Sequence, residues 1–324
     1  MSTGREAERS SFDAEVNFDT EVTEEATNRI CSDLSAISGT KITVQNLINE
    51  KVILKRGDGF APTNAYALLQ GGVFAFTEVR CALFKGREKN LDRTMFLDRR
   101  ECTGPVYRQI EDAYAFVLKN IRLESRYEGG IARVDEYEIP HEVVKEVITN
   151  AVLHRSYIRG NMPTYVAIFD DRVEVTSPGK LYGGMTVEQM LEGKTERRNP
   201  VLGKVFALAR ISEGWGRGVM GLTARCAERG LEAPAFEEWG DDFRVTLYRK
   251  PLFAEAGAQR IRELAGAELR VYEAFASNPY ESMSAVAESL GVSVATVKRH
   301  VAELKKKGRL AREGGSGRGA WIAK

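Results

Sequence analysis

The chain has 324 residues, of which 43% are hydrophobic and 29% are charged, and a formal net charge of +1. This is the composition of a soluble globular protein with two or three domains. Because the sequence contains neither an apolar run of about 18 residues nor a signal-peptide core, we expect a cytoplasmic protein without a membrane span. The four cysteines form no C-x-x-C pair, which argues against a zinc cage and a disulfide framework.

Charge is distributed unevenly along the chain. Residues 1–25 carry a net charge of −6, whereas residues 260–324 carry +5. A basic C-terminal end favours a polyanionic partner, although charge alone does not identify that partner. Residues 1–22 are polar, acidic and without hydrophobic periodicity, so we predict a disordered tail there.

Residues 23–135 predict a mixed α+β connecting region. Glu24 to Lys51 predicts two short helices, Val73 to Phe84 has strand composition, and Val106 to Ile121 has the apolar spacing of a helix. Arg122 to Pro140 predicts a hairpin.

The segment Lys51 to Leu69 has two interpretations. Its turn residues around Gly57 and Gly59 predict a hairpin followed by a helix. The same pattern is compatible with a second, degenerate winged helix. The sequence leaves both interpretations open, and it does not decide whether residues 23–72 form an independent domain or a brace.

Residues 136–250 predict a separate α/β domain. Helices are expected at 142–153, 186–191, 201–211 and 219–229, and strands on both sides of the turn in 164–177 and at 243–249. The following residues, 251–262, are the least patterned part of the chain and predict a linker.

The helix at 142–153 carries two residues of chemical interest. Glu146 and Asn150 are four positions apart, so they lie on one face of the helix. A carboxylate beside an amide can activate a water molecule and hold a cation through oxygen. Because the E-x-x-x-N pattern is common in amphipathic helices, it needs the support of other motifs.

Glycines near residue 214 give that support. Gly214, Gly216, Gly218 and Gly221 lead into an expected helix, where backbone N–H groups can approach a phosphate. The stretch also fits G-x-G-x-x-G, but a dinucleotide site needs a strand directly before it, and the preceding segment has helical periodicity. The sequence contains no P-loop, so a P-loop motor is not supported.

The last part of the chain, residues 263–324, predicts a winged helix-turn-helix. Helices are expected at Leu269–Ala276, Met283–Leu290 and Val294–Leu304, with a sharp turn between the second and the third. Ser293 can cap the third helix. Such a domain binds duplex DNA, and the alternative is a protein-binding module of the same fold.

The third helix and the wing supply candidate contacts to double-stranded DNA. The N-terminal half of the helix would meet the bases, and the cations that follow would contact phosphates. The candidates are Ser293, Thr296, Lys298, Arg299, Lys305, Lys306, Lys307, Arg309 and Arg318.

The motifs of the middle region occur in a characteristic order. NAVLHRSY is followed by IFDDRVEVTSPGKL, RRNPVLGKVF, EGWGRGVMGL and FRVTLYR. In this order they resemble the divergent GHKL ATPase-like domain, also called RecG-like C-terminal, of bacterial transcriptional regulators. The similarity extends upstream to about Leu68. Many relatives carry a Schlafen-type nucleic-acid-binding domain before this region, and the chain has no room there for a complete copy.

The resemblance implies a two-layer α/β sandwich with a nucleotide site. In GHKL ATPases such as gyrase, the first helix supplies a glutamate that activates water and an asparagine for magnesium, and Glu146 and Asn150 match them. The aspartate that binds adenine is missing, because Ser177 and Gly179 stand at the corresponding place. The four glycines near residue 214 match the box that wraps the triphosphate of ATP.

Two hypotheses about function result. In the first, the protein is a homodimeric, DNA-binding transcriptional regulator whose central domain senses a nucleotide or another ligand. In the second, it is a magnesium-dependent ATPase that remodels a DNA or protein complex. The missing aspartate favours the first hypothesis. Histidine kinase activity is disfavoured because His141 and His154 both lie in the first helix of the ATPase-like domain itself.

Overall fold

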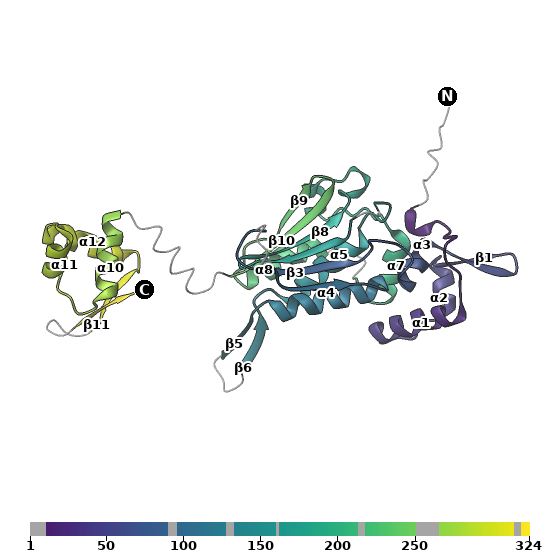
Figure 1. Cartoon of the computed structure of the whole chain (residues 1–324), viewed down its shortest axis with the longest axis horizontal. Helices are drawn as coiled ribbons and strands as arrows, with labels where there is room; N and C mark the ends of the chain where they lie inside the picture. The colour runs from purple at the N-terminus through teal and green to yellow at the C-terminus, as the bar shows by residue number, and fades with distance from the viewer. Residues whose placement is uncertain are drawn as a thin grey trace, which may run out of the picture. The chain divides into compact units, whose positions relative to one another are not determined.

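The computed structural model describes residues 11–89, 96–127, 133–159, 162–212, 218–250, 266–313 and 319–324. The chain divides into two compact units, residues 1–250 and residues 251–324 (Figure 1). Across these described ranges, none of the helices is long and apolar enough to cross a membrane.

A six-stranded mixed sheet forms the centre of the first unit. Its strand order is β4-β3-β7-β8-β10-β9, and the pairs are antiparallel except for β3 with β7. The strands are β3 (Val79–Phe84), β4 (Phe96–Cys102), β7 (Thr164–Ile168), β8 (Arg172–Pro178), β9 (Ala235–Trp239) and β10 (Asp242–Tyr248). The expected strands on either side of the Asp170-Asp171 turn are therefore β7 and β8.

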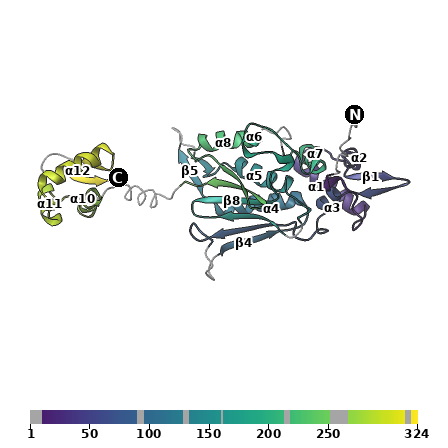
Figure 2. The same cartoon turned by 90° about the horizontal axis from the view of Figure 1, so that it is seen from above.

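Helices pack against one face of this sheet (Figures 1 and 2). Helix α4 packs against β3 and β4, and α5 packs against α4, β8 and α8. The helices after the N-terminal region are α4 (Val106–Asn120), α5 (His141–Leu153), α6 (Val187–Leu191), α7 (Pro200–Leu208) and α8 (Gly218–Glu228). The mixed α/β fold predicted from the sequence is confirmed.

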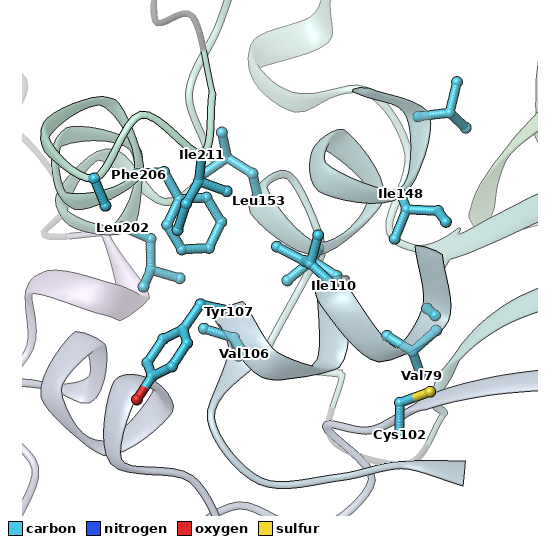
Figure 3. Close-up of a cluster of buried hydrophobic side chains, with 14 of the residues drawn as sticks. Val79, Cys102, Val106, Tyr107, Ile110, Ile148, Leu153, Leu202, Phe206 and Ile211 are labelled. Atoms are coloured by element: carbon cyan, nitrogen blue, oxygen red, sulfur yellow. The ribbon is translucent and has the colours of Figure 1, made fainter. Parts of the chain in front are cut away.

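One apolar cluster fills the space between the helices and the sheet. Val106 and Ile110 of α4 and Ile148 of α5 are at most 2% exposed. Leu202 and Phe206 of α7 are fully buried in the same cluster (Figure 3). Burial at every third or fourth position of a helix gives the periodicity from which these helices were predicted.

The boundary predicted at residue 135 does not separate two domains. β3 comes from the predicted connecting region, and it pairs in parallel with β7 of the predicted ATPase-like region. Val79 lies opposite Thr164 and Leu83 opposite Ile168. Because strands from both sides of residue 135 share one sheet and one core, the described residues of 11–250 belong to a single compact unit.

The sequence pattern predicts neither edge strand of the sheet. β4 has the sequence FLDRREC, and five of its seven residues are exposed. β9 has the sequence AFEEW and ends in three exposed residues. Edge strands are often charged, because charge prevents further pairing, and this weakens the apolar alternation that marks a strand.

The N-terminal region packs against this unit as a brace. Its elements are α1 (Glu24–Ser38), α2 (Val44–Asn49), β1 (Ile53–Arg56), β2 (Gly59–Pro62) and α3 (Asn64–Gln70). Among the described residues, two α-helices precede the β1–β2 hairpin, and α3 after it is buried through Tyr66, Leu68 and Leu69. A degenerate winged helix is therefore the wrong interpretation of Lys51 to Leu69, and the hairpin followed by a helix is confirmed. The predicted hairpin at 122–140 forms as β5 (Leu123–Tyr127) and β6 (Arg133–Tyr137).

Residues 11–22 do not form a disordered tail. Asp13 is fully buried and accepts hydrogen bonds from the N–H groups of Val201 and Leu202 at the start of α7, at 2.7 and 2.9 Å. The predicted disorder is wrong from residue 11 onward, because one acid of a seemingly solvated run binds the positive end of a helix. Residues 1–10 lie outside the described residues, as does the predicted linker, 251–262.

Asp13 makes the stability of the protein depend on pH. Its pKa is raised above the ordinary 3.8 because burial disfavours the charged carboxylate, and hydrogen bonds from Leu202 and Ser11 oppose this only in part. The folded state therefore keeps this proton to a higher pH than the unfolded state. The free energy of unfolding should fall as the pH rises through the range just above 3.8.

Asp13→Asn, which keeps an acceptor oxygen and lacks the charge, should remove the part of the pH dependence of stability that comes from Asp13. Urea denaturation of the wild type and the variant between about pH 4 and pH 6 should therefore show a difference in the free energy of unfolding that changes with pH. A difference that stays constant over that range would contradict the assignment.

The second unit is a winged helix-turn-helix, as predicted. It consists of α10 (Gly266–Ser277), α11 (Met283–Leu290), α12 (Val294–Lys306), β11 (Leu310–Glu313) and β12 (Ala320–Ala323). Phe275, Val297 and Leu304 are fully buried in its core, and the Phe275 ring lies 4.9 Å from the ring of Trp321. The strands β11 and β12 form the antiparallel wing.

Candidate functional site

A cavity of about 160 Å³ lies in the first unit. Its wall is built from α5, β8, β9, β10, the first turns of α8 and the segment 179–197. Glu146 and Asn150 of α5 line it together with Ser177 and Gly179 at the end of β8. The structure therefore brings four of the predicted site residues to one cavity, although they come from two separate elements.

The two α5 residues are hydrogen-bonded to each other. The Asn150 side-chain amide donates to Glu146 Oε1 at 3.0 Å, which is the contact expected of an i, i+4 pair on one helical face. A carboxylate and an amide oxygen in a cavity wall are groups that can hold a water molecule or a magnesium ion. Among the residues that the structure describes, no three His, Cys, Asp or Glu side chains gather as a metal site.

At the β8 end of the cavity, Ser177 and Gly179 stand where the resemblance implies an aspartate. The Ser177 hydroxyl donates its hydrogen to the carbonyl oxygen of Ala151 at 2.6 Å. Gly179 has a φ of +101°, and a Cβ built on it would lie 2.7 Å from the Ser156 Cβ. The glycine is therefore required by close packing of the chain, and the hydroxyl ties β8 to α5.

The predicted phosphate-binding glycines are described only in part. Gly214 and Gly216 lie outside the described residues. Gly218 begins α8, and Gly221 lies in the first turn of that helix, where Val219 lines the cavity. The element before these glycines is α7, a helix, so the dinucleotide-binding interpretation, which requires a strand there, is excluded.

Sequence reasoning missed most of the cavity wall. Met185, Met190, Lys194, Phe236 and Phe243 all line the cavity. Apart from Phe243, which begins the FRVTLYR motif, they belong to no motif, and they come from two segments that meet only in the folded chain. The alternation of Phe243 and Val245 on the predicted β10 strand was the one available signal.

Cationic side chains surround one part of the wall. Lys180, Lys194 and Arg197 line the cavity. Desolvation and the guanidinium groups of Arg197 and Arg198 lower the pKa of the His154 side chain to about 4. The imidazole is therefore neutral at pH 7 and adds no positive charge to the cavity.

The described residues of this cavity match the residue types for ATP and magnesium, which the resemblance implies, only in part. The α5 pair has the residue types for magnesium and water. At the β8 end, Ser177 stands in place of the carboxylate that the resemblance implies, and its hydroxyl donates to the carbonyl oxygen of Ala151 while it can still accept a hydrogen bond.

In the second unit, α12 has one buried and one exposed face. Val297, Val301 and Leu304 are buried, while Lys298 and Arg299 are exposed. This orientation, predicted from the sequence, leaves both cations available to a polyanion.

The start of α12 is fixed by two of the predicted contact residues. Ser293 caps the helix by accepting a hydrogen bond from the Thr296 N–H at 3.1 Å. The two hydroxyl oxygens lie 2.8 Å apart. Both side chains are therefore engaged with each other at the N-terminus of the helix.

The remaining predicted cations fall into different surroundings. Lys305 Nζ lies 5.2 Å from the centre of the Trp321 ring, and the Arg312 guanidinium lies 5.3 Å from it. Arg312, which sequence reasoning missed, therefore adds a cation at the base of the wing. Arg309 is half-buried beside the wing, and Arg318 lies outside the described residues.

Lys307 is already paired within the domain. The Lys307 Nζ lies 2.8 Å from the carboxylate of Glu268 on α10, and the Glu268 side chain is only 7% exposed. Lys306, by contrast, is exposed. Lys307→Ala should lower the free energy of unfolding by roughly 1 kcal/mol, because it leaves a nearly buried carboxylate unpaired. Lys306→Ala should leave stability unchanged and weaken DNA binding.

Urea denaturation and fluorescence anisotropy with a labelled duplex separate these two effects. Equal losses of DNA affinity in both variants, with equal stability, would contradict the division of roles.

Two segments of the chain match known family models. Residues 162–247 match the family model described as "Putative ATP-dependent DNA helicase recG C-terminal". Residues 264–310 match the model of winged helix-turn-helix DNA-binding domains. The chain carries a RecG C-terminal-type domain followed by a winged helix-turn-helix. The first match begins after α5, so Glu146 and Asn150 lie outside it.

One solved structure has a fold similar to that of this chain. The DIP2311 protein from Corynebacterium diphtheriae is 18% identical to this chain, with a TM-score of 0.59. The match covers 97% of this chain and 64% of the length of that protein. This likeness shows the fold alone.

A second structure has a local likeness to part of the chain. A "Possible transcriptional regulator from Methanosarcina mazei Go1" is 24% identical over 28% of this chain and 72% of its own, with a TM-score of 0.17. That value supports no argument about fold. No curated protein matches the chain.

Proposed function

We propose that this protein is a DNA-binding transcriptional regulator whose RecG C-terminal-type domain senses a small ligand in the α5–β8 cavity. The winged helix-turn-helix carries this proposal, because it presents Lys298 and Arg299 on the exposed face of α12 and places Arg312 at the base of its wing. A helix in the major groove with wing cations on flanking phosphates is the usual arrangement of such domains on DNA.

The DNA-binding part of the proposal is tested with the full chain and a library of random-sequence duplexes. Several rounds of retention and sequencing should enrich one motif, and binding of the enriched duplex should weaken steeply as salt rises. The protein-binding alternative for the winged helix would be supported by retention of no duplex at low salt, and that result would overturn the proposal.

We also propose that the regulator acts as a homodimer. Two winged helices on one dimer would read two half-sites about one helical turn apart, which gives a palindromic motif. Sedimentation of the free protein and of its complex with the enriched duplex measures this stoichiometry. A single half-site motif bound by one chain would contradict dimeric recognition.

The second candidate function is a magnesium-dependent ATPase. The hydrogen-bonded pair of Glu146 and Asn150 in the cavity wall favours it, because these residue types serve water activation and magnesium binding. The two candidates differ in one measurement, release of phosphate from ATP by the purified chain. Sensing predicts no turnover, whereas turnover that is lost in both Glu146→Ala and Asn150→Ala would establish the enzyme.

A further inference from the structure

The wall of the α5–β8 cavity is mainly apolar. Thirteen of its residues are aliphatic, aromatic or methionine side chains, from α5, from the three strands β8, β9 and β10, from α8 and from the segment 181–190. They are Val147, Ala151, Leu153, Val175, Leu181, Tyr182, Met185, Met190, Val219, Leu222, Phe236, Phe243 and Val245. An occupant of this space must therefore have an apolar body, since polar groups buried there would lose their hydrogen bonds to water.

The size of the cavity limits that body. A protein cavity of about 150 Å³ lined by apolar side chains accommodates one benzene ring, and this cavity measures about 160 Å³. A single ring or a short branched chain fills it. A purine has two fused rings, so its base alone exceeds the single ring that this volume accommodates.

The charges of the wall favour an anion. Its cations are Lys180, Lys194 and Arg197, and its carboxylates are Glu146 and Glu196. Glu146 is hydrogen-bonded to Asn150. Across the described part of the chain, Lys180 and Lys194 have no carboxylate within ion-pairing distance, so both ammonium groups are available to a ligand.

We infer that the ligand of this cavity is a small organic anion with an apolar body of about one ring, such as an aromatic carboxylate, and that it is not an adenine nucleotide. The apolar body occupies the space between α5 and the strands, and the anionic group is held by Lys180 and Lys194. This inference rests on the proposed sensing role of the cavity. It names the class of ligand that the regulator would sense.

The test is thermal denaturation of the full chain with benzoate as the probe, compared with benzyl alcohol and with ATP plus magnesium. Benzoate should raise the Tm of the first unit by about 3 °C at roughly ten times its Kd. Benzyl alcohol, which has the ring without the charge, should give a clearly smaller rise, and ATP should give none. An equal effect of benzyl alcohol, a larger effect of ATP, or no effect of benzoate would each overturn the inference.

Two variants locate the binding. Lys180→Gln/Lys194→Gln changes two exposed side chains and should weaken benzoate binding at least about fivefold in calorimetry. The matched control Lys145→Gln/Lys204→Gln changes two exposed lysines that do not line the cavity and should bind normally. Val175→Phe fills the cavity and should abolish binding, with circular dichroism to confirm folding. Unchanged affinity in the double cavity variant would overturn the assignment even if Val175→Phe does not fold.

A failure of the ligand proposal can be distinguished from a failure of the proposed DNA-binding function. Benzoate binding is measured without DNA, and selection of a duplex motif is measured without benzoate. Normal motif selection with no benzoate binding rejects the ligand class alone, whereas benzoate binding with no duplex retention rejects the DNA-binding role.

Discussion

Replacing Glu138 by Ala is expected to lower the free energy of unfolding by about 3–5 kcal/mol, because the change leaves buried guanidinium charge without a partner. Glu138 lies in the short segment that connects β6 to α5, and it is fully buried. Its carboxylate lies 2.8 Å from Arg249 Nη2 and 2.5 Å from Arg122 Nη2, and it accepts the Arg122 backbone N–H at 2.8 Å. Urea denaturation followed by circular dichroism measures the loss.

Two controls separate the lost charge pairing from other effects of this substitution. Glu142→Ala removes a carboxylate that is 54% exposed and should change the free energy of unfolding by less than about 0.5 kcal/mol. Arg122→Met/Glu138→Leu/Arg249→Met removes all three charges together and should cost less than Glu138→Ala alone. If the single variant is as stable as the wild type, the three side chains do not form a buried charged cluster.

Replacing Lys298 and Arg299 together by Ala is expected to weaken binding of the enriched duplex by about tenfold to a hundredfold. Both side chains lie on the exposed face of α12, whose opposite face is buried through Val297, Val301 and Leu304. The slope of log affinity against log salt should also become shallower by about 2, because two fewer phosphate counterions are released. Fluorescence anisotropy over a salt series measures both quantities.

The matched control is Lys204→Ala, which removes an exposed cation of α7 in the first unit. It should leave the affinity and the salt slope unchanged. The Tm of the second unit should be unchanged in Lys298→Ala/Arg299→Ala, because neither residue contributes to its core. An unaltered affinity of the double variant at all salt concentrations would show that α12 is not the helix that reads DNA.

The winged helix-turn-helix could be predicted almost completely from the sequence. The sequence predicts a helix at Met283–Leu290, and α11 has these same bounds. Ser293 caps α12 as expected. The prediction succeeds because the sequence signals of this small domain are local: the apolar spacing of the second and third helices, the turn and the cap lie within about twenty residues of one another.

The first unit could be predicted less well, because its sheet is built from distant segments. β3 and β7 are more than eighty residues apart along the chain, and they pair across a boundary that composition and motifs placed at residue 135. The burial of Asp13 against α7 depends on a contact between residues 188 positions apart. No local pattern marks such a contact, so an acidic residue that binds a helix N-terminus looks the same as a solvated one.

The candidate site divides in the same way. The sequence by itself determined that Glu146 and Asn150 share a helical face and that Lys298 and Arg299 lie away from the core of their domain, because helical spacing alone decides both. Only the tertiary structure decided that Ser177 donates its hydroxyl hydrogen to Ala151, and that Lys180 and Lys194 line an apolar cavity. Those facts follow from packing between separate elements, and packing sets cavity size, burial and the partners of each polar group.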